Sequence, residues 1–293
     1  MTIRLDMREA LSKAPQALGE SAKAVGGFFR RHLSHDGGFL GRDGRSDLYY
    51  TVFGLEASLS LGVDLAVDLV TRYLDGFGTG ESLDLVHLAS LIRCRANLSD
   101  VSGGEILTRH LLEYRSRDGG FNMAPGAEQG SAYGSFLALG AWQDLGIDCP
   151  DADAMARSIA SLQRSDGGYA NEASMTAGAT PATAAAVSVL HDLGCPVPES
   201  AVRWLLDRVS PLGGFEAIRF GESHGVPDLL STATALRALA LLGISAGAMK
   251  DKHMDYLDSL WDKQGGFRGH WADDVVDCEY TYYGLLALGT LAE

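Results

Sequence analysis

The segment DGGFLGRDGRSDLYYTVFGLEASLSLG, residues 36–62, determines the architecture of this 293-residue chain because both of its parts recur along the sequence. It opens with a Gly-Gly-aromatic unit, and an apolar run follows in which Asp47, Thr51 and Leu55 are four residues apart. Positions i, i+4 and i+8 lie on one face of an α-helix. The segment therefore predicts a tight turn followed by a helix.

The Gly-Gly-aromatic unit returns at intervals that suit helical hairpins. Its copies are residues 36–39, 118–121, 166–169, 212–215 and 264–267, and a sixth copy at 75–77 has lost one glycine. The first glycines are 39 to 52 residues apart, a period that holds two helices and two loops. Glycine reverses the chain after a helix because it adopts positive φ without steric cost. We expect the aromatic residue that follows to fill the gap between neighbouring hairpins.

A helix of common register follows each unit. The helix starts align at Asp47, Asp84, Gln129, Ala179, Asp228 and Asp277. These helices are rich in Ala, Gly and Leu nearly all the way round, as buried helices are, whereas the segments between them carry charges on one side. Gly62, Gly194 and Gly243 are expected to end three of the buried helices. Six inner and six outer helices predict an all-α (α/α)₆ toroid, with residues 1–293 forming a single domain.

Charge and composition exclude several partners. The formal net charge is −14, so a nucleic-acid backbone is an unfavourable partner. Hydrophobic residues make up 46% of the chain, which is enough for a sizeable core. No apolar stretch approaches the roughly 20 residues of a transmembrane helix, and no secretory signal opens the sequence. Four cysteines lack any C-x-x-C spacing, which favours a reducing, cytoplasmic location.

Tandem Gly-Gly-[Phe/Tyr] units before D-x-x-x-T helices resemble the prenyltransferase and squalene-cyclase repeat family, from about Gly37 to Leu288. That family comprises protein prenyltransferase β subunits, which transfer a farnesyl or geranylgeranyl group to a cysteine, and class II terpene cyclases, which cyclise polyisoprenes. Both place the lipid inside the toroid. The resemblance implies a hydrophobic isoprenoid small molecule as ligand, while any protein partner stays unknown.

Aromatic residues cluster at the predicted mouths of the inner helices and are candidates for contact with such a ligand. They are Tyr49, Tyr50, Phe53, Tyr133, Phe136, Tyr280, Tyr282 and Tyr283. Aromatic faces stabilise cations by about 0.5–2 kcal/mol per contact. Packing in the core is the alternative role for each of them.

The resemblance to protein prenyltransferases implies a zinc site at Asp228, Leu230 and Tyr280. Leucine cannot bind zinc and tyrosine rarely does, so we expect no metal and no other cofactor, with zinc disfavoured. Asp228 remains a candidate substrate-binding residue. A prenyltransferase with an altered metal site around Asp228 is the second interpretation of the sequence.

The resemblance to class II cyclases points to the sixth inner helix. These enzymes protonate an alkene or epoxide with the middle carboxyl of a D-x-D-D-T-A motif, and here Glu279 occupies that position while Asp277 keeps the first one. Burial and the like charge of Asp277 raise the pKa of Glu279, whereas the helix N-terminus lowers it. The sequence alone does not determine whether the net shift of the Glu279 pKa is upward or downward. Helix capping is the alternative role of the recurring aspartates at 47, 84, 228 and 277.

The sequence thus predicts an isoprenoid-handling enzyme, a single-domain class II-type terpene cyclase of the isomerase or lyase type. Glu279, assisted by Asp277, would start the cyclisation inside an aromatic-lined cavity. A prenyltransferase-like enzyme and a non-catalytic toroid that binds a lipid or a protein are the alternatives. Chain length and head group of the substrate, product skeleton and oligomeric state are not determined by the sequence.

Overall fold

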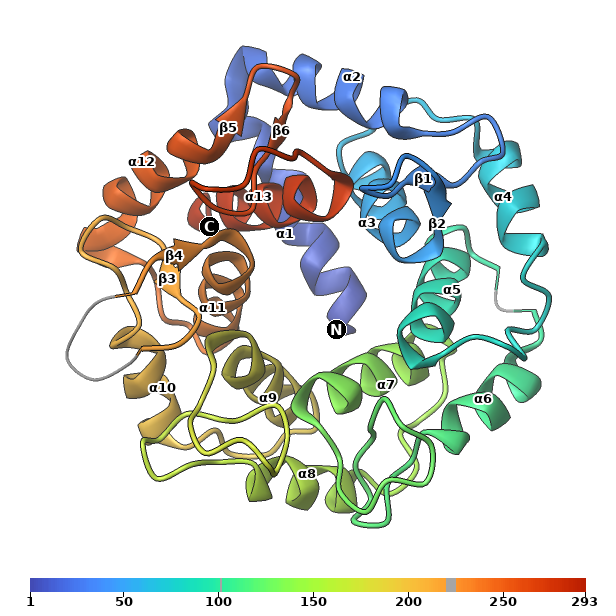
Figure 1. Ribbon diagram of the computed structural model, residues 1–293, viewed down its shortest axis with the longest axis vertical. Helices are drawn as coiled ribbons and strands as arrows, with labels where there is room; N and C mark the ends of the chain where they lie inside the picture. The colour runs from blue at the N-terminus through green and yellow to red at the C-terminus, as the bar shows by residue number, and fades with distance from the viewer. Residues whose placement is uncertain (101, 220–224) are drawn as a thin grey trace.

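Two concentric rings of helices form the protein (Figure 1). The computed structural model describes residues 1–100, 102–219 and 225–293. The inner ring consists of α3 (Leu48–Ser60), α5 (Leu85–Asn97), α7 (Ala132–Asp144), α9 (Thr180–Asp192), α11 (Leu229–Leu241) and α13 (Cys278–Leu291). Each inner helix packs against the next, and α13 packs against α3, so the ring closes. The predicted (α/α)₆ toroid is confirmed.

The outer ring alternates with the inner one along the chain. It consists of α2 (Ala22–His32), α4 (Val67–Asp75), α6 (Gly104–Glu113), α8 (Ala152–Ser161), α10 (Glu199–Leu206) and α12 (Lys250–Leu260). Two short 3₁₀ segments, Gly19–Ser21 and Gly247–Met249, precede α2 and α12. The first outer helix meets the last loop where Arg31 Nη2 donates to the carbonyl of Gln264 at 2.6 Å. No helix in the described ranges is long and apolar enough to cross a membrane.

The Gly-Gly-aromatic units lie in the loops that lead from outer to inner helices. Three of these regions contain a two-stranded antiparallel ribbon: β1 (Phe39–Leu40) with β2 (Ser46–Asp47), β3 (Phe215–Glu216) with β4 (Pro227–Asp228), and β5 (Trp261–Asp262) with β6 (Gly266–Phe267). The first glycine of the five complete units has the predicted positive φ, for example 99° at Gly37, whereas Gly76 of the shortened copy has a φ of −60°. The aromatic residue is fully buried, as expected, at Phe39, Phe121, Tyr169, Phe215 and Phe267.

A hydroxyl in five of the six inner helices holds this loop in place, whereas α5 has Leu88 at the equivalent position. The backbone N–H of Phe39 donates to Thr51 Oγ1 at 2.9 Å, and the Thr51 hydroxyl donates to the carbonyl of Asp47 at 2.6 Å. Threonines 183, 232 and 281 accept in the same way from the aromatic residues of their own copies, at 2.9–3.2 Å. The threonine of the D-x-x-x-T pattern therefore links the loop to the helix that follows it.

The third copy departs from the predicted register by two residues. Ser131, rather than Gln129, caps α7 by accepting from the N–H of Gly134 at 3.0 Å. Ser135, rather than Tyr133, accepts from the N–H of Phe121 at 3.1 Å. The predicted start at Gln129 is therefore wrong. Serine replaces threonine at the linking position because either residue supplies the required hydroxyl.

The N-terminal helix α1 (Ile3–Leu18) was not predicted and belongs to neither ring. Figure 1 shows it crossing the middle of the ring, with the N-terminus near the centre. It packs mainly on α13, where Ala10 and Ala14 are fully buried. A Cβ on Gly289 of α13 would collide with the carbonyl of Ala10, so this glycine permits the close helix crossing.

Candidate active site

A cavity of about 420 Å³ lies inside the inner ring and is lined by all six inner helices and α1. Its volume falls within the roughly 300–1,000 Å³ of ordinary small-molecule sites. Counted from each helix N-cap, the wall has three layers, at the second, sixth and ninth positions. The second layer is Tyr49, Tyr133, Pro181, Leu230 and Glu279; the sixth is Phe53, Ser90, Leu137, Ala185, Thr234 and Tyr283; the ninth is Glu56, Arg93, Gly140, Ser188, Arg237 and Leu286.

This layering follows from helix geometry, because positions 2, 6 and 9 share one face of a helix. The six inner helices run in the same direction around the axis, so equal positions lie at equal depth. The second layer is nearest the helix N-termini and the ninth is nearest the C-termini. The register predicted for five of the six helices is therefore what brings the site residues together.

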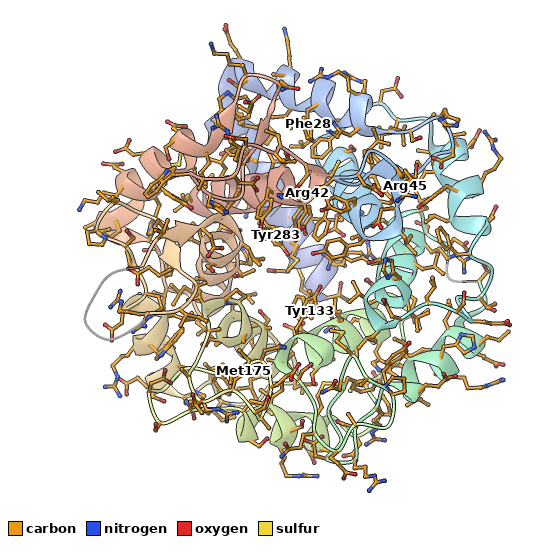
Figure 2. The ribbon with its side chains drawn as sticks, in the orientation of Figure 1. Phe28, Arg42, Arg45, Tyr133, Met175 and Tyr283 are labelled. Atoms are coloured by element: carbon orange, nitrogen blue, oxygen red, sulfur yellow. The ribbon has the colours of Figure 1, made fainter. Side chains whose placement is uncertain are left out.

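Aromatic side chains line one side of the cavity. Six of the predicted aromatic residues are in the wall: Tyr49, Phe53, Tyr133, Phe136, Tyr282 and Tyr283. Figure 2 shows Tyr133 and Tyr283 turned toward the centre of the ring. The ring centroid of Phe53 is 4.9 Å from that of Tyr49 and 5.6 Å from that of Tyr283. These contacts hold a continuous aromatic surface beside the cavity.

Glu279 is the carboxyl group of the second layer. The hydroxyl of Tyr49 donates to its Oε1 at 2.6 Å. Burial raises the pKa of Glu279 above its usual range; the charge of Asp277 acts in the same direction, and the Tyr49 hydrogen bond and Arg42 act against it. The net shift of the Glu279 pKa is upward. A carboxyl with a raised pKa that faces an apolar cavity is suited to donating a proton.

Four other predicted residues do not line the described cavity: Tyr50, Asp228, Asp277 and Tyr280. They occupy the cap position or the third position of their helices, and each step along a helix turns a side chain by about 100° away from its neighbour. Asp277 Oδ1 accepts from the N–H of Tyr280 at 2.8 Å, and its Oδ2 accepts from Arg42 Nε at 2.7 Å. Asp277 thus does not line the cavity, and it affects Glu279 only through its charge, which raises the pKa of Glu279.

The recurring aspartates are helix caps. Each accepts a hydrogen bond from the backbone N–H three residues later, at 3.1 Å for Asp47, 2.9 Å for Asp84, 2.7 Å for Asp228 and 2.8 Å for Asp277. The capping alternative is therefore confirmed for all four. Such caps stabilise a helix start by about 1 kcal/mol.

The residues at the positions that bind zinc in protein prenyltransferase β subunits do not fit that metal. Asp228 is a helix cap, Leu230 offers no donor atom, and the ring of Tyr280 lies under the guanidinium of Arg42 at 5.3 Å. Across residues 1–100, 102–219 and 225–293, no three His, Cys, Asp or Glu side chains are grouped as metal ligands. The donor set here contains one carboxylate and no thiolate or imidazole, unlike a structural or catalytic zinc site.

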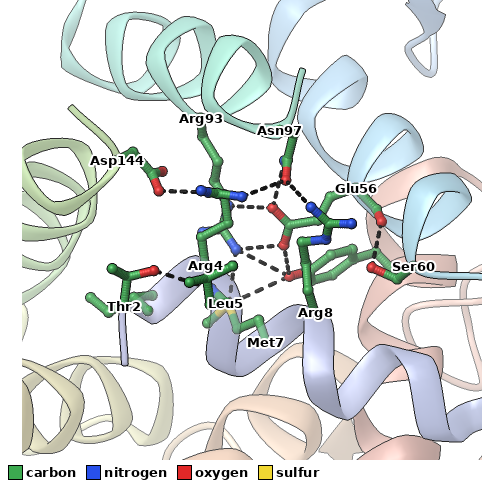
Figure 3. A network of polar contacts seen from close by, with 12 residues as sticks. Thr2, Arg4, Leu5, Met7, Arg8, Glu56, Ser60, Arg93, Asn97 and Asp144 are labelled. Atoms are coloured by element: carbon green, nitrogen blue, oxygen red, sulfur yellow. Dashed lines mark hydrogen bonds and ion pairs between the residues drawn. The ribbon is translucent and has the colours of Figure 1, made fainter. Parts of the chain in front are cut away.

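The charged residues of the ninth layer were not predicted from the sequence. Glu56 is fully buried and accepts from Arg93 Nη2 at 2.6 Å, Arg93 Nε at 2.7 Å, Asn97 Nδ2 at 2.9 Å and the Tyr282 hydroxyl at 2.7 Å (Figure 3). Burial acts to raise the pKa of Glu56, but the charge of Arg93 and these hydrogen bonds hold it below its usual value. The available signal was that Glu56 and Arg237 are the single charges of the otherwise apolar helices α3 and α11.

Comparison with known proteins agrees with this architecture. The model of the prenyltransferase alpha-alpha toroid domain matches residues 83–217 and 210–293. No curated protein matches the sequence significantly.

Several solved structures share the fold. Protein geranylgeranyltransferase-I from Candida albicans, complexed with GGPP, has a TM-score of 0.67 and 15% identity, covering 92% of this chain and 90% of that one. A variant of the type II terpene cyclase MstE from Scytonema, in complex with geranylgeranyl dihydroxybenzoate (substrate), has a TM-score of 0.63 and 15% identity, covering 95% and 97%. A protein from Actinoplanes has a TM-score of 0.62 and 15% identity, covering 94% and 99%. At 15% identity, these similarities show a shared fold and no more.

Proposed function

This chain belongs to the prenyltransferase alpha-alpha toroid family, and within that family we propose that it is an isoprenoid-handling enzyme, a class II-type terpene cyclase. The observation that supports this proposal is the position of Glu279. Its carboxyl group lies in the cavity wall, is bound by the Tyr49 hydroxyl at 2.6 Å, and has a raised pKa. These are the properties that an acid needs to protonate a hydrocarbon away from water.

The proposed reaction begins with protonated Glu279. Its proton passes to the terminal alkene or epoxide of a polyprenyl substrate, and the π pair or the epoxide oxygen forms the new bond to hydrogen. A carbocation results, in the case of the epoxide because the C–O bond of the protonated oxygen breaks; the next alkene attacks the cation, and a ring closes. The final cation releases a proton to solvent, so the product is an isomer of the substrate. The Glu279 carboxylate then recovers a proton from solvent.

The surroundings of Glu279 favour both the proton transfer and the carbocation that follows it. The hydrogen bond from Tyr49 stabilises the carboxylate that remains after proton transfer. Phe53 and Tyr283 line the same cavity as Glu279, and a cation over the face of an aromatic ring gains about 0.5–2 kcal/mol per contact. The apolar wall keeps out water that would otherwise trap the cation. The reaction needs no metal, and we propose that the protein uses none.

Turnover in heavy water tests the proposal. Suitable substrates are geranylgeraniol, its terminal epoxide and geranylgeranyl dihydroxybenzoate, the last being the substrate named for the MstE complex. We expect a cyclic product that is isomeric with the substrate. A product that starts from protonation of an alkene should carry one carbon-bound deuterium from the acid, whereas the epoxide takes up the deuteron on an oxygen that exchanges with solvent. Glu279→Gln keeps the acceptor for Tyr49 but cannot donate an acidic proton, so turnover should fall by at least about 100-fold.

The control is Glu128→Gln, because Glu128 lies on the surface with a side chain that is 71% exposed. Its activity should equal that of the wild type. Unchanged turnover in Glu279→Gln would remove Glu279 as the acid. One tightly bound zinc ion, with prenyl transfer to a thiol, would instead identify a prenyltransferase. Polyprenyl binding without any turnover would identify a non-catalytic lipid-binding toroid.

A further inference from the structure

The helix α1 forms part of the cavity wall. Ile3 and Met7 line the cavity beside the ninth-layer residues of the inner helices, at the C-terminal end of the ring. Seven residues separate the second layer from the ninth, so at 1.5 Å per residue Glu279 is about 10 Å above this level. The cavity therefore has an acid near one end and α1 across the other.

Buried polar contacts fix α1 in this position. Arg4 Nε donates to Asp144 Oδ1 at 2.7 Å, and Arg237 binds both oxygens of Asp6 at 2.7 and 2.8 Å (Figure 3 shows the first pair). The N–H of Ile3 donates to Gln143 Oε1 at 2.7 Å. These contacts join α1 to α7 and α11, in addition to its packing on α13. These contacts make α1 a fixed part of the cavity wall.

Met7 is the α1 side chain held most directly over the charged layer. Its Sδ accepts from Arg93 Nη2 at 3.2 Å and from the Tyr282 hydroxyl at 3.4 Å. The thioether thus lies beside the Glu56–Arg93 ion pair, and all three residues line the same end of the cavity. A hydrocarbon chain that descends from Glu279 reaches the apolar side chain of Met7 at this end.

We propose that Met7 is a specificity-determining residue, the floor against which the hydrocarbon chain stops and folds back. This inference rests on the proposed function, because it takes the ligand to be a polyprenyl chain whose reactive end lies at Glu279. An extended geranylgeranyl chain is longer than the depth available. A fixed floor therefore imposes a folded chain, and folding brings one alkene close to the next before a ring closes.

Chain-length selectivity tests the floor. The affinities of geraniol, farnesol and geranylgeraniol are measured by calorimetry for the wild type, Met7→Trp and Met7→Ala. Met7→Trp fills the lower cavity, so geranylgeraniol should bind at least about tenfold more weakly while geraniol changes little. Met7→Ala deepens the cavity and should shift the preference toward the longest alcohol. Leu5→Trp and Leu5→Ala are the matched controls, because Leu5 lies on the same helix and is 45% exposed.

The outcomes separate this inference from the proposed function. A wild-type protein that binds none of the three alcohols contradicts the proposed function and the floor together. A wild-type protein that binds them, with an unchanged chain-length profile in both Met7 variants, overturns the floor alone. Should Met7→Trp fail to fold by circular dichroism, the opposite shift expected for Met7→Ala decides the question.

Discussion

At the scale of single residues, Glu279 lies where its charge is unfavourable. Burial raises the pKa of this carboxyl in the folded protein, whereas in the unfolded chain the value is about 4.3. The folded state therefore binds the proton more tightly. Glu279 costs no stability below the unfolded pKa, and stability is lost as pH rises from there through the folded pKa. A proton donor held in an apolar cavity should therefore weaken the fold at neutral pH.

Glu279→Gln should accordingly be more stable than the wild type at pH 7. Glutamine still accepts the hydrogen bond from Tyr49 but cannot ionise. The difference in melting temperature should be smallest near pH 4 and should grow as pH rises, as scanning calorimetry from pH 4 to 8 would reveal. Glu128→Gln, at the exposed pair with Arg117, should show no such growth. A difference that does not change with pH would contradict the raised pKa.

At the scale of elements, the repeating loops were predictable and two other features were not. Gly37 and its equivalents were identifiable because only glycine suits the positive φ that the turn needs. The start of α7 was misplaced because Ser135 supplies the hydroxyl that threonine supplies elsewhere. Helix α1 has no partner in the repeat. Its apolar stripe, with Ile3, Ala10, Leu11 and Ala14 buried, was visible in the sequence but indicated no docking site.

Two glycines of the first loop allow the effect of backbone conformation on stability to be distinguished from the effect of packing. Gly37 and Gly44 both have positive φ, at 99° and 75°, but a Cβ on Gly37 would collide with the carbonyl of Leu69 in α4, while a Cβ on Gly44 meets nothing. Gly44→Ala should cost about 1–2 kcal/mol of unfolding free energy. Gly37→Ala should cost about 1–3 kcal/mol more, because the loop must move away from α4. Equal urea midpoints for the two variants would contradict this packing role.

At the scale of the whole molecule, the two ends of the cavity differ in chemistry. The end at the helix N-termini combines aromatic rings with one acid, and the sequence predicted most of it because the aromatic residues cluster at helix starts. The other end carries ion pairs and hydrogen bonds that join five helices, α1, α3, α5, α7 and α13 (Figure 3). Those contacts were not predicted because their partners are up to 226 residues apart and meet only once the ring has closed.

The Glu56–Arg93 pair should be a main support of the closed ring. Removing one partner of a buried ion pair costs about 3–5 kcal/mol, because the other charge stays buried without compensation. Glu56→Gln should lower the unfolding free energy by that amount, measured by urea denaturation at pH 7. Glu128→Gln, which breaks the exposed pair with Arg117, should cost about 0–1 kcal/mol.

The sign of the pH dependence gives this last prediction a second test. Because the folded pKa of Glu56 is held below its usual value, its contribution is present above the unfolded pKa of about 4.3 and is lost as pH falls through the folded pKa. The gap between Glu56→Gln and the wild type should therefore narrow in acid, opposite to the trend for Glu279→Gln. The double variant Glu56→Leu with Arg93→Met should recover stability relative to Glu56→Gln, since it leaves no unpaired charge. A double variant as unstable as Glu56→Gln would indicate that side-chain packing, rather than charge pairing, joins the five helices.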